Sequence, residues 1–323
     1  MVKIRIHKRK EKRREGKGML LPALLFFLLF PYIISGFSDV KKQTLAKEDV
    51  PGQIWVLQKR VWGSQKIPLE EYLMGMIAAT IPVEYEPETL KAQAVILRSY
   101  CINHMKKEAG EKIIYDDVLQ GYYFSPKECK KMWEENAEDN LTKIEKAVQD
   151  TQGLILVCDG DIVEAPFCRM SNGKSRDIAE YVVRKENYKY MKSEVCEKDG
   201  LAKDFVQYTE INQEEFEKIL KKLMGESFKG LKKITLYRDA NSYVKEVQVG
   251  EKLMEGEQFR EALGLVSSCF SLDKINDVIE IQTKGIGHGF GFSQYEANEQ
   301  AKNGKDYTLL LHYFFQNITL EKI

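Results

Sequence analysis

Residues 285–297 read Gly-Ile-Gly-His-Gly-Phe-Gly-Phe-Ser-Gln-Tyr-Glu-Ala, and the rest of this 323-residue chain can be placed around them. Four glycines alternate with larger residues, a pattern that weakens a packed strand because side-chain contacts are missing. Glycine adopts positive φ and lets the backbone approach another group closely. The spacing of Tyr295 and Ala301 predicts a helix that ends at Gly304. A glycine-rich β-bulge around a buried histidine would fit, but the pattern also predicts a backbone-lined pocket wall that carries His288, Ser293, Gln294 and Tyr295.

Periodic patterns in the rest of the chain predict a mixed α+β domain. Alternating residues indicate strands, and prolines mark the ends of helices. In chain order we expect a hairpin over Ile54–Ile67 with Gly63-Ser64 as its turn, a helix over Leu69–Thr80, a helix from Pro87, a surface helix over Glu128–Asp150, a hairpin through Cys158-Asp-Gly160, a polar helix over Phe205–Gly225 and a strand pair over 233–249.

The N-terminal part of the chain has a different composition. Residues 1–18 form a basic tail, and residues 19–37 contain no charged side chain. About twenty apolar residues span a bilayer, and the basic flank is expected on the cytoplasmic side. We therefore expect a single transmembrane anchor over 19–37, a linker over 38–53 and one extracytoplasmic domain over 54–323. A cleaved signal peptide is the alternative, because Ser35-Gly36-Phe37-Ser38 offers small residues.

The charge balance argues against nucleic acid as a partner of the main domain. The whole chain carries 49 basic and 49 acidic residues, and residues 1–17 hold nine of the former and two of the latter. The remainder therefore has 40 basic and 47 acidic residues, a net charge of about −7.

Two blocks of sequence resemble the stage II sporulation protein D family, which also includes the amidase-enhancer protein LytB. One is the glycine stretch, which departs from the family only at Glu296. The other runs from Pro68-Leu-Glu-Glu-Tyr to Thr80-Ile-Pro82 and on to Glu88-Thr-Leu-Lys-Ala-Gln-Ala-Val-Ile-Leu-Arg-Ser-Tyr100. Weaker matches in the family order extend the resemblance over roughly 55–320. The resemblance implies an elongated α+β domain with a cleft for peptidoglycan glycan strands.

Lys91 and Arg98 are seven residues apart, so a helix places them on one face about 10 Å apart. Two cations on one wall suit an acidic or oxygen-rich ligand, although salt bridges with Glu88 and nearby acids would also explain them. Tyr190 and Lys192 would point the same way from a strand. The resemblance implies that one substrate-binding cleft is lined by Lys91, Arg98, Ser171, Gly173, Tyr190, Lys192 and the loop with His288, Ser293, Gln294 and Tyr295.

The family's catalytic acid is the glutamate of a Glu-Met-Pro tripeptide, which here reads Thr80-Ile81-Pro82. A lytic transglycosylase needs a carboxyl group that first protonates the glycosidic oxygen and then takes the proton of the muramyl C6 hydroxyl. A threonine hydroxyl cannot do this near neutral pH. Glu84, Glu86 and Glu88 are nearby candidates for a displaced acid, although a helix start lowers the pKa of a carboxyl at Glu88.

Six cysteines are scattered without a Cys-x-x-Cys pair. The metal-binding spacing of some family members is absent, so we expect no metal and no cofactor. Cys168 stands where the family commonly has histidine. A disulfide between Cys168 and Cys196 is possible on an extracytoplasmic chain, and two separately buried thiols are the alternative.

Three functions fit these observations. The first is a membrane-anchored peptidoglycan-binding protein of the engulfment type, with lost or altered transglycosylase activity, that acts with a cell-wall amidase and other engulfment membrane proteins. The second is an active lytic transglycosylase that uses a displaced glutamate. The third is a non-catalytic scaffold of a membrane complex.

Overall fold

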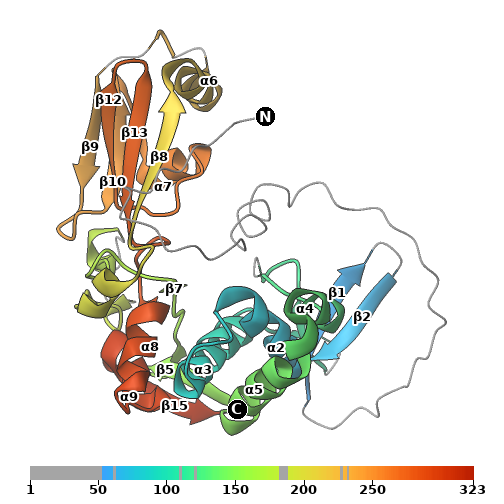
Figure 1. Cartoon of the computed structure of the whole chain (residues 1–323). Coiled ribbons are helices and arrows are strands. Elements are labelled where there is room, and N and C mark those ends of the chain that lie inside the picture. The colour runs from blue at the N-terminus through green and yellow to red at the C-terminus, as the bar shows by residue number, and fades with distance from the viewer. Residues whose placement is uncertain are drawn as a thin grey trace. The chain divides into compact units, whose positions relative to one another are not determined.

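The computed structural model describes residues 53–323, except 61–62, 109–110, 120–121, 182–187, 226–227 and 231–232. Helices and strands are mixed along this part of the chain, which confirms the α+β class (Figure 1). The predicted basic tail, anchor and all but the last residue of the linker lie outside the described residues. Within the described ranges, no helix has the length and apolar character needed to cross a bilayer.

The first sheet contains the predicted N-terminal hairpin. Strands β1 (Ile54–Arg60) and β2 (Gly63–Pro68) pair antiparallel, with Arg60 opposite Gly63. Gly63 and Ser64 are both paired with β1, so the predicted turn at Gly63-Ser64 is wrong. Strand β4 (Glu111–Tyr115) pairs parallel with β1, and β3 (Lys106–Glu108) completes the order β2-β1-β4-β3.

Four helices share one hydrophobic core with this sheet. Helix α2 (Leu69–Thr80) has the predicted bounds, and α3 (Pro87–Asn103) begins at the predicted proline, whose fixed φ suits a first helical position. The predicted surface helix is instead two helices, α4 (Pro126–Trp133) and α5 (Ala137–Asp150). Glu134 separates them because its φ of 48° is not helical.

Helix α3 is central, and this decides which of its residues reach solvent. One side packs with α2 and α5 in a core that includes Leu90 and Leu97. Its other side packs in a second core with strand β5 (Leu154–Cys158) and helix α9 (Tyr307–Phe314). Strand β5 lies between β6 (Asp161–Ile162) and β15 (Thr319–Lys322), and the predicted β5–β6 hairpin is confirmed.

A third core joins two three-stranded sheets and two helices, which Figure 1 shows together. The predicted polar helix over Phe205–Gly225 is wrong in its first part, where β8 (Val206–Asn212) pairs with β13 along its whole length. The predicted strand pair over 233–249 is confirmed. The elements are β8, α6 (Gln213–Met224), β9 (Ile234–Arg238), β10 (Val244–Val249), β11 (Lys252–Glu255), α7 (Gly256–Ala262), β12 (Phe270–Ile275) and β13 (Val278–Lys284).

The glycine stretch connects β13 to the predicted helix, here α8 (Gln294–Lys302). Just before α8, the short strand β14 (Phe292–Ser293) pairs parallel with β7 (Phe167–Cys168). This pair brings the glycine stretch against residues 166–171, which end at the first residue of the Ser171-Asn-Gly motif.

Candidate functional site

The glycines of the 285–297 stretch are required by close packing against protein. Gly285, Gly287, Gly289 and Gly291 all have φ between 68° and 108°, a region that favours glycine. A Cβ at Gly289 would lie 2.3 Å from the Tyr243 ring, and one at Gly291 would lie 2.1 Å from the Pro166 carbonyl oxygen. The loop therefore presses its backbone onto neighbouring segments, as in the alternative of a glycine-rich bulge.

A buried carboxylate connects the two serine motifs. Asp199, in the 3-10 helix Glu197–Leu201, accepts hydrogen bonds from the Ser171 backbone N–H and hydroxyl, both at 2.7 Å. It also accepts one from the Ser293 hydroxyl at 2.8 Å. Burial raises the pKa of Asp199 to about 6, against the opposing effect of the serine donors.

Ser171 and Ser293 were expected to contact substrate, but both are fully buried. Gly173 belongs to the same arrangement, since its backbone N–H donates to the Ser171 hydroxyl at 3.1 Å. These residues hold three segments of chain together. Asp199 was not identified from the sequence, because no local pattern marks a buried acid that is 28 residues from one partner and 94 from the other.

His288 lies in the glycine loop as a neutral acceptor. The Phe290 backbone N–H donates to its Nδ1 at 3.0 Å, and burial of the ring lowers the pKa of His288 to about 4. The buried Arg176 guanidinium holds this loop, because it donates to the His288 carbonyl oxygen at 3.1 Å and stacks over Phe290. The same guanidinium pairs with Asp239 and Glu257.

Thr80, at the position where the resemblance implies an acid, lies inside a frame of two amide side chains. Its hydroxyl donates to the Met76 carbonyl oxygen of the same helix at 2.8 Å. Gln294 Nε2 donates to the Thr80 carbonyl oxygen at 2.9 Å and to Gln93 Oε1 at 3.2 Å. The Gln93 Nε2 group is fully buried and has no hydrogen-bond partner among the described residues. The structure thus joins Thr80 and Gln294, which are 214 residues apart.

The three nearby glutamates differ in how they are held. The Glu88 carboxylate accepts from Lys91 Nζ at 2.8 Å and from the Tyr307 backbone N–H at 3.0 Å. Glu84 is exposed and Glu86 partly buried. Within the described ranges, neither of these two carboxyl groups has a hydrogen-bond partner.

The two cations of α3 do not form one open wall. Arg98 is fully buried and pairs with both carboxylate oxygens of Glu70, at 2.8 and 2.6 Å. It also donates to the Leu154 carbonyl oxygen at 3.1 Å. Lys91 pairs with Glu88 at 2.8 Å and with Asp150 at 3.1 Å. The salt-bridge alternative describes both side chains, and Arg98 has no surface to offer a ligand.

Tyr190 and Lys192 were predicted to point the same way from a strand, but neither residue lies on a strand. Tyr190 is buried and its hydroxyl donates to the Glu164 carbonyl oxygen at 2.9 Å, whereas Lys192 is exposed. The possible disulfide is also absent, because all six cysteines are free and buried. Burial raises the pKa of both the Cys168 and the Cys196 thiol. In the described ranges, no group of three or more metal-ligating side chains converges.

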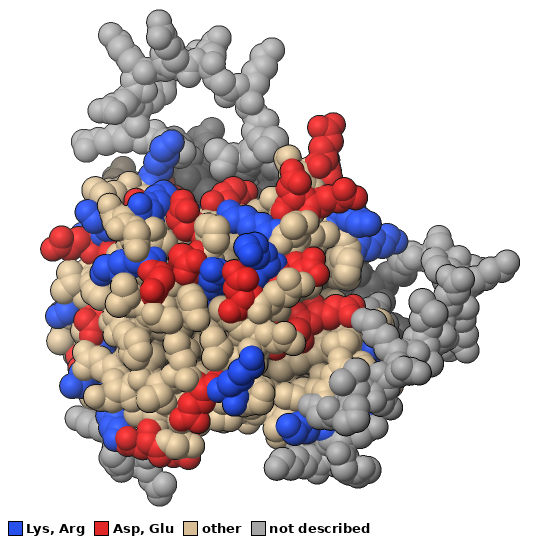
Figure 2. Space-filling view, turned by 90° about the horizontal axis from the view of Figure 1, so that it is seen from below, with Lys and Arg blue, Asp and Glu red and all other residues tan. Residues whose placement is uncertain are grey.

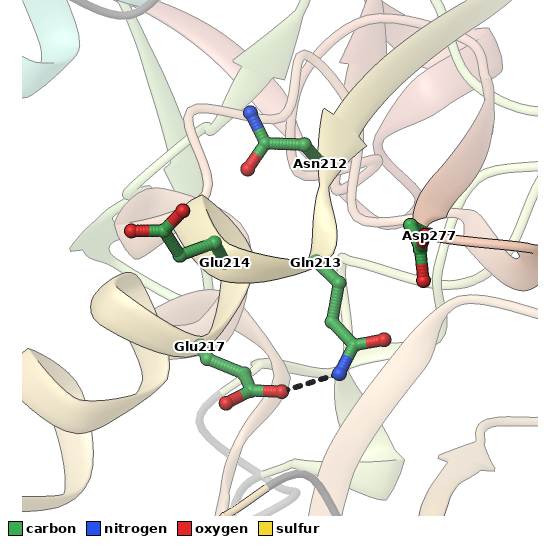
Figure 3. A pocket seen from close by; sticks show the side chains of 5 residues that line it. All are labelled: Asn212, Gln213, Glu214, Glu217 and Asp277. Carbon is green, nitrogen blue, oxygen red and sulfur yellow. Dashed lines mark hydrogen bonds between the residues drawn. The ribbon is translucent and has the colours of Figure 1, made fainter.

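A pocket of about 480 Å³ lies elsewhere, at the start of α6 (Figure 3). Three of its side chains have local partners: Gln213 donates to Glu217 at 2.6 Å, and Glu214 pairs with Lys218 at 2.8 Å. It contains none of the predicted site residues. The candidate site is therefore where the sequence motifs meet, and this pocket is not part of it. The pocket is lined by Asn212, Gln213, Glu214, Glu217 and Asp277.

The charged side chains on one face of the molecule bear on nucleic-acid binding. Figure 2 shows acidic and basic side chains intermixed around a broad uncharged area. Neither sign gathers into one continuous patch on this face, and a phosphate backbone would need such a patch of basic residues.

Comparison with known proteins gives consistent matches. The sequence model of the family described as "Stage II sporulation protein" matches residues 58–158. A stage II sporulation protein D of Bacillus amyloliquefaciens is 33% identical over 264 residues, which cover 80% of this chain and 75% of that protein. The protein of the same description from Bacillus subtilis (strain 168) is 34% identical, with coverages of 80% and 76%. An uncharacterised protein of Brachyspira hyodysenteriae is 26% identical over 79% of this chain and 67% of its own length.

Proposed function

Because the chain belongs to the stage II sporulation protein D family, we propose that it is a membrane-anchored peptidoglycan-binding protein of sporulation that works with a cell-wall amidase. The N-terminus is cytoplasmic in this proposal, and the domain over 54–323 acts outside the membrane. Its own transglycosylase reaction is lost. Other engulfment membrane proteins are further partners of this proposal.

The observation that carries the proposal is the state of position 80. The family's acid would have to exchange a proton twice with the glycan, and this requires a carboxyl group. The Thr80 hydroxyl is bonded to Met76 in its own helix. The amide frame around it remains, since Gln294 still contacts both Thr80 and Gln93. A preserved frame without an acid supports binding without cleavage.

A second candidate is an active lytic transglycosylase that uses Glu84 or Glu86. This candidate is supported by the absence of hydrogen-bond partners for these two carboxyl groups within the described ranges. Glu88 is a weaker candidate, because Lys91 and the Tyr307 backbone already hold its carboxylate.

One experiment separates the two candidates. Purified full-length protein in detergent is incubated with intact sacculi and with glycan strands stripped of peptides. Sedimentation then measures binding, and mass spectrometry searches for 1,6-anhydromuramyl products. We expect binding without anhydro product. A cell-wall amidase should release peptides faster in the presence of this protein than alone. Anhydro product that disappears in Glu84→Gln or Glu86→Gln, but not in Glu88→Gln, would establish the second candidate.

The proposed anchor has its own test. The full chain should remain with the membrane fraction after lysis and high-salt washing, and its N-terminus should be protected from external protease. Release of a shortened form into the medium would contradict the anchor and support a cleaved signal peptide.

A further inference from the structure

A partly exposed surface lies beside Thr80, and it includes an arginine side chain that takes no part in the hydrogen bonds or ion pairs of the described residues. It begins where β7 and β14 end side by side, with Ser293 opposite Cys168. The next residues continue this contact, because the Tyr295 backbone N–H donates to the Arg169 carbonyl oxygen at 3.0 Å. Arg169 is exposed and Tyr295 is partly exposed. The pairing of two short strands therefore sets an arginine next to a tyrosine.

The loop after Thr80 adds a second tyrosine to this surface. The loop lies along α8, since Gln294 bonds the Thr80 carbonyl oxygen and the Glu86 backbone N–H donates to Asn298 Oδ1 at 2.8 Å. Asn298 is three residues after Tyr295, hence on the same side of the helix. Tyr85, next to Glu86, is partly buried. Burial raises the pKa of Tyr85 to about 12, and the positive charge of Arg169 opposes that rise, as expected for close neighbours.

Arg169 differs from the other arginines whose side chains the structure describes. Each of the others donates to a carboxylate or a backbone carbonyl, so each is accounted for by folding: Arg98, Arg176, Arg238 and Arg260. In the described part of the chain, the Arg169 guanidinium makes no hydrogen bond or ion pair. Its fork of donors is left free for a molecule from solution.

We infer that Arg169 binds the lactyl carboxylate of a muramyl residue while Tyr85 and Tyr295 pack against the sugar rings. This inference rests on the proposed function and names the feature of the glycan that is recognised. A guanidinium matches a carboxylate with two parallel hydrogen bonds. Tyrosine offers an apolar face and a hydroxyl, which suits the mixed surface of a sugar. In this inference the carboxylate belongs to the ligand. Binding therefore does not require a carboxyl group at position 80.

The test compares two glycans on the full-length protein in detergent. One is a peptide-free glycan strand with free lactyl carboxylates, and the other is a chito-oligosaccharide of equal length, which lacks them. The variants are Arg169→Gln, the conservative Arg169→Lys, and Lys222→Gln as a matched control in an exposed lysine of α6. A hydrogen bond to a charged group contributes about 1.5–3 kcal/mol, so Arg169→Gln should weaken the muramyl glycan at least about tenfold.

The expected pattern is selective. Wild type and Lys222→Gln should prefer the muramyl glycan, Arg169→Gln should lose that preference, and Arg169→Lys should keep part of it. Binding of the chito-oligosaccharide should change little in Arg169→Gln and fall in Tyr85→Leu. If wild type binds and Arg169→Gln keeps the full preference, the inference is wrong while the proposed function stands. If Arg169→Gln weakens both glycans equally, its role is structural and the inference is also wrong. If wild type binds neither glycan, the proposed function fails and the inference fails with it.

Discussion

The buried carboxylate of Asp199 should make stability depend on pH in an unusual direction. Burial raises its pKa from 3.8 to about 6, so the folded protein holds the proton more tightly than the unfolded chain. Stability from this group is therefore fully present below about pH 4 and is lost as pH rises through about 6. Most carboxyl groups act in the opposite direction, since their pKa is lowered in the folded state.

The magnitude follows from the size of the shift. One pKa unit corresponds to about 1.4 kcal/mol. Ionisation of Asp199 should then cost about 3 kcal/mol of unfolding free energy between about pH 4 and pH 6. Asp199→Asn cannot ionise, yet it keeps the side-chain shape and one acceptor oxygen for the donors of Ser171 and Ser293. The free energy of unfolding of this variant should therefore lack that component of the pH dependence.

The assay is urea unfolding of wild type and Asp199→Asn at a series of pH values from 4 to 7. We expect the stability of the variant relative to wild type to rise by about 3 kcal/mol across this range. Ser293→Ala is the matched control, because it removes a donor that lowers the pKa of Asp199. Its transition should move to higher pH. Parallel curves for wild type and Asp199→Asn would refute the reasoning, and so would a relative gain of wild type with rising pH.

Three further substitutions test the packing around the site by urea unfolding. Arg98→Met should destabilise by about 3 kcal/mol, because it leaves the Glu70 carboxylate without its buried partner; a loss below about 1 kcal/mol would contradict a structural role for this ion pair. Gly289→Ala should destabilise by about 3 kcal/mol or more, since φ is +81° and the new Cβ would lie 2.3 Å from the Tyr243 ring, whereas Gly200→Ala has open space and should change little. Thr89→Val should stabilise by about 1 kcal/mol, because the buried Thr89 hydroxyl has no hydrogen-bond partner among the described residues; a clear loss of stability would contradict this reasoning.

The sequence predicts elements best where local signals mark both ends. Helix α2 lies between Pro68 and the Pro82 turn, and α3 begins with Pro87, so both were located correctly. The β8–α6 boundary was missed although a local signal exists: Asn212 caps α6 by accepting from the Glu215 backbone N–H at 2.8 Å. The charged composition of the segment suggested a single helix and obscured that signal.

The candidate site was harder to predict, because polar residues in a motif can serve the fold. The helical pattern of α3 indicates one buried stripe, but tertiary packing buries nearly every side of this helix. Arg98 consequently faces Glu70 in the interior. Ser171 and Ser293 face Asp199, which no pattern near either serine reveals. Burial of this kind depends on segments that are far apart in sequence, so it is not encoded in local periodicity.

The frame around Thr80 shows how the architecture of this site tolerates different side chains at one position. Gln294 bonds the backbone carbonyl oxygen of residue 80, a contact that any residue can supply. The side chain at that position is thus free to change without loss of the contacts among α2, α3 and α8. For folding, the backbone carbonyl oxygen that Gln294 contacts is sufficient, and the Thr80 hydroxyl bonds within its own helix. The match of Gln294 to the family motif is therefore weak support for cleavage, and the residues that decide the function are those that folding does not explain.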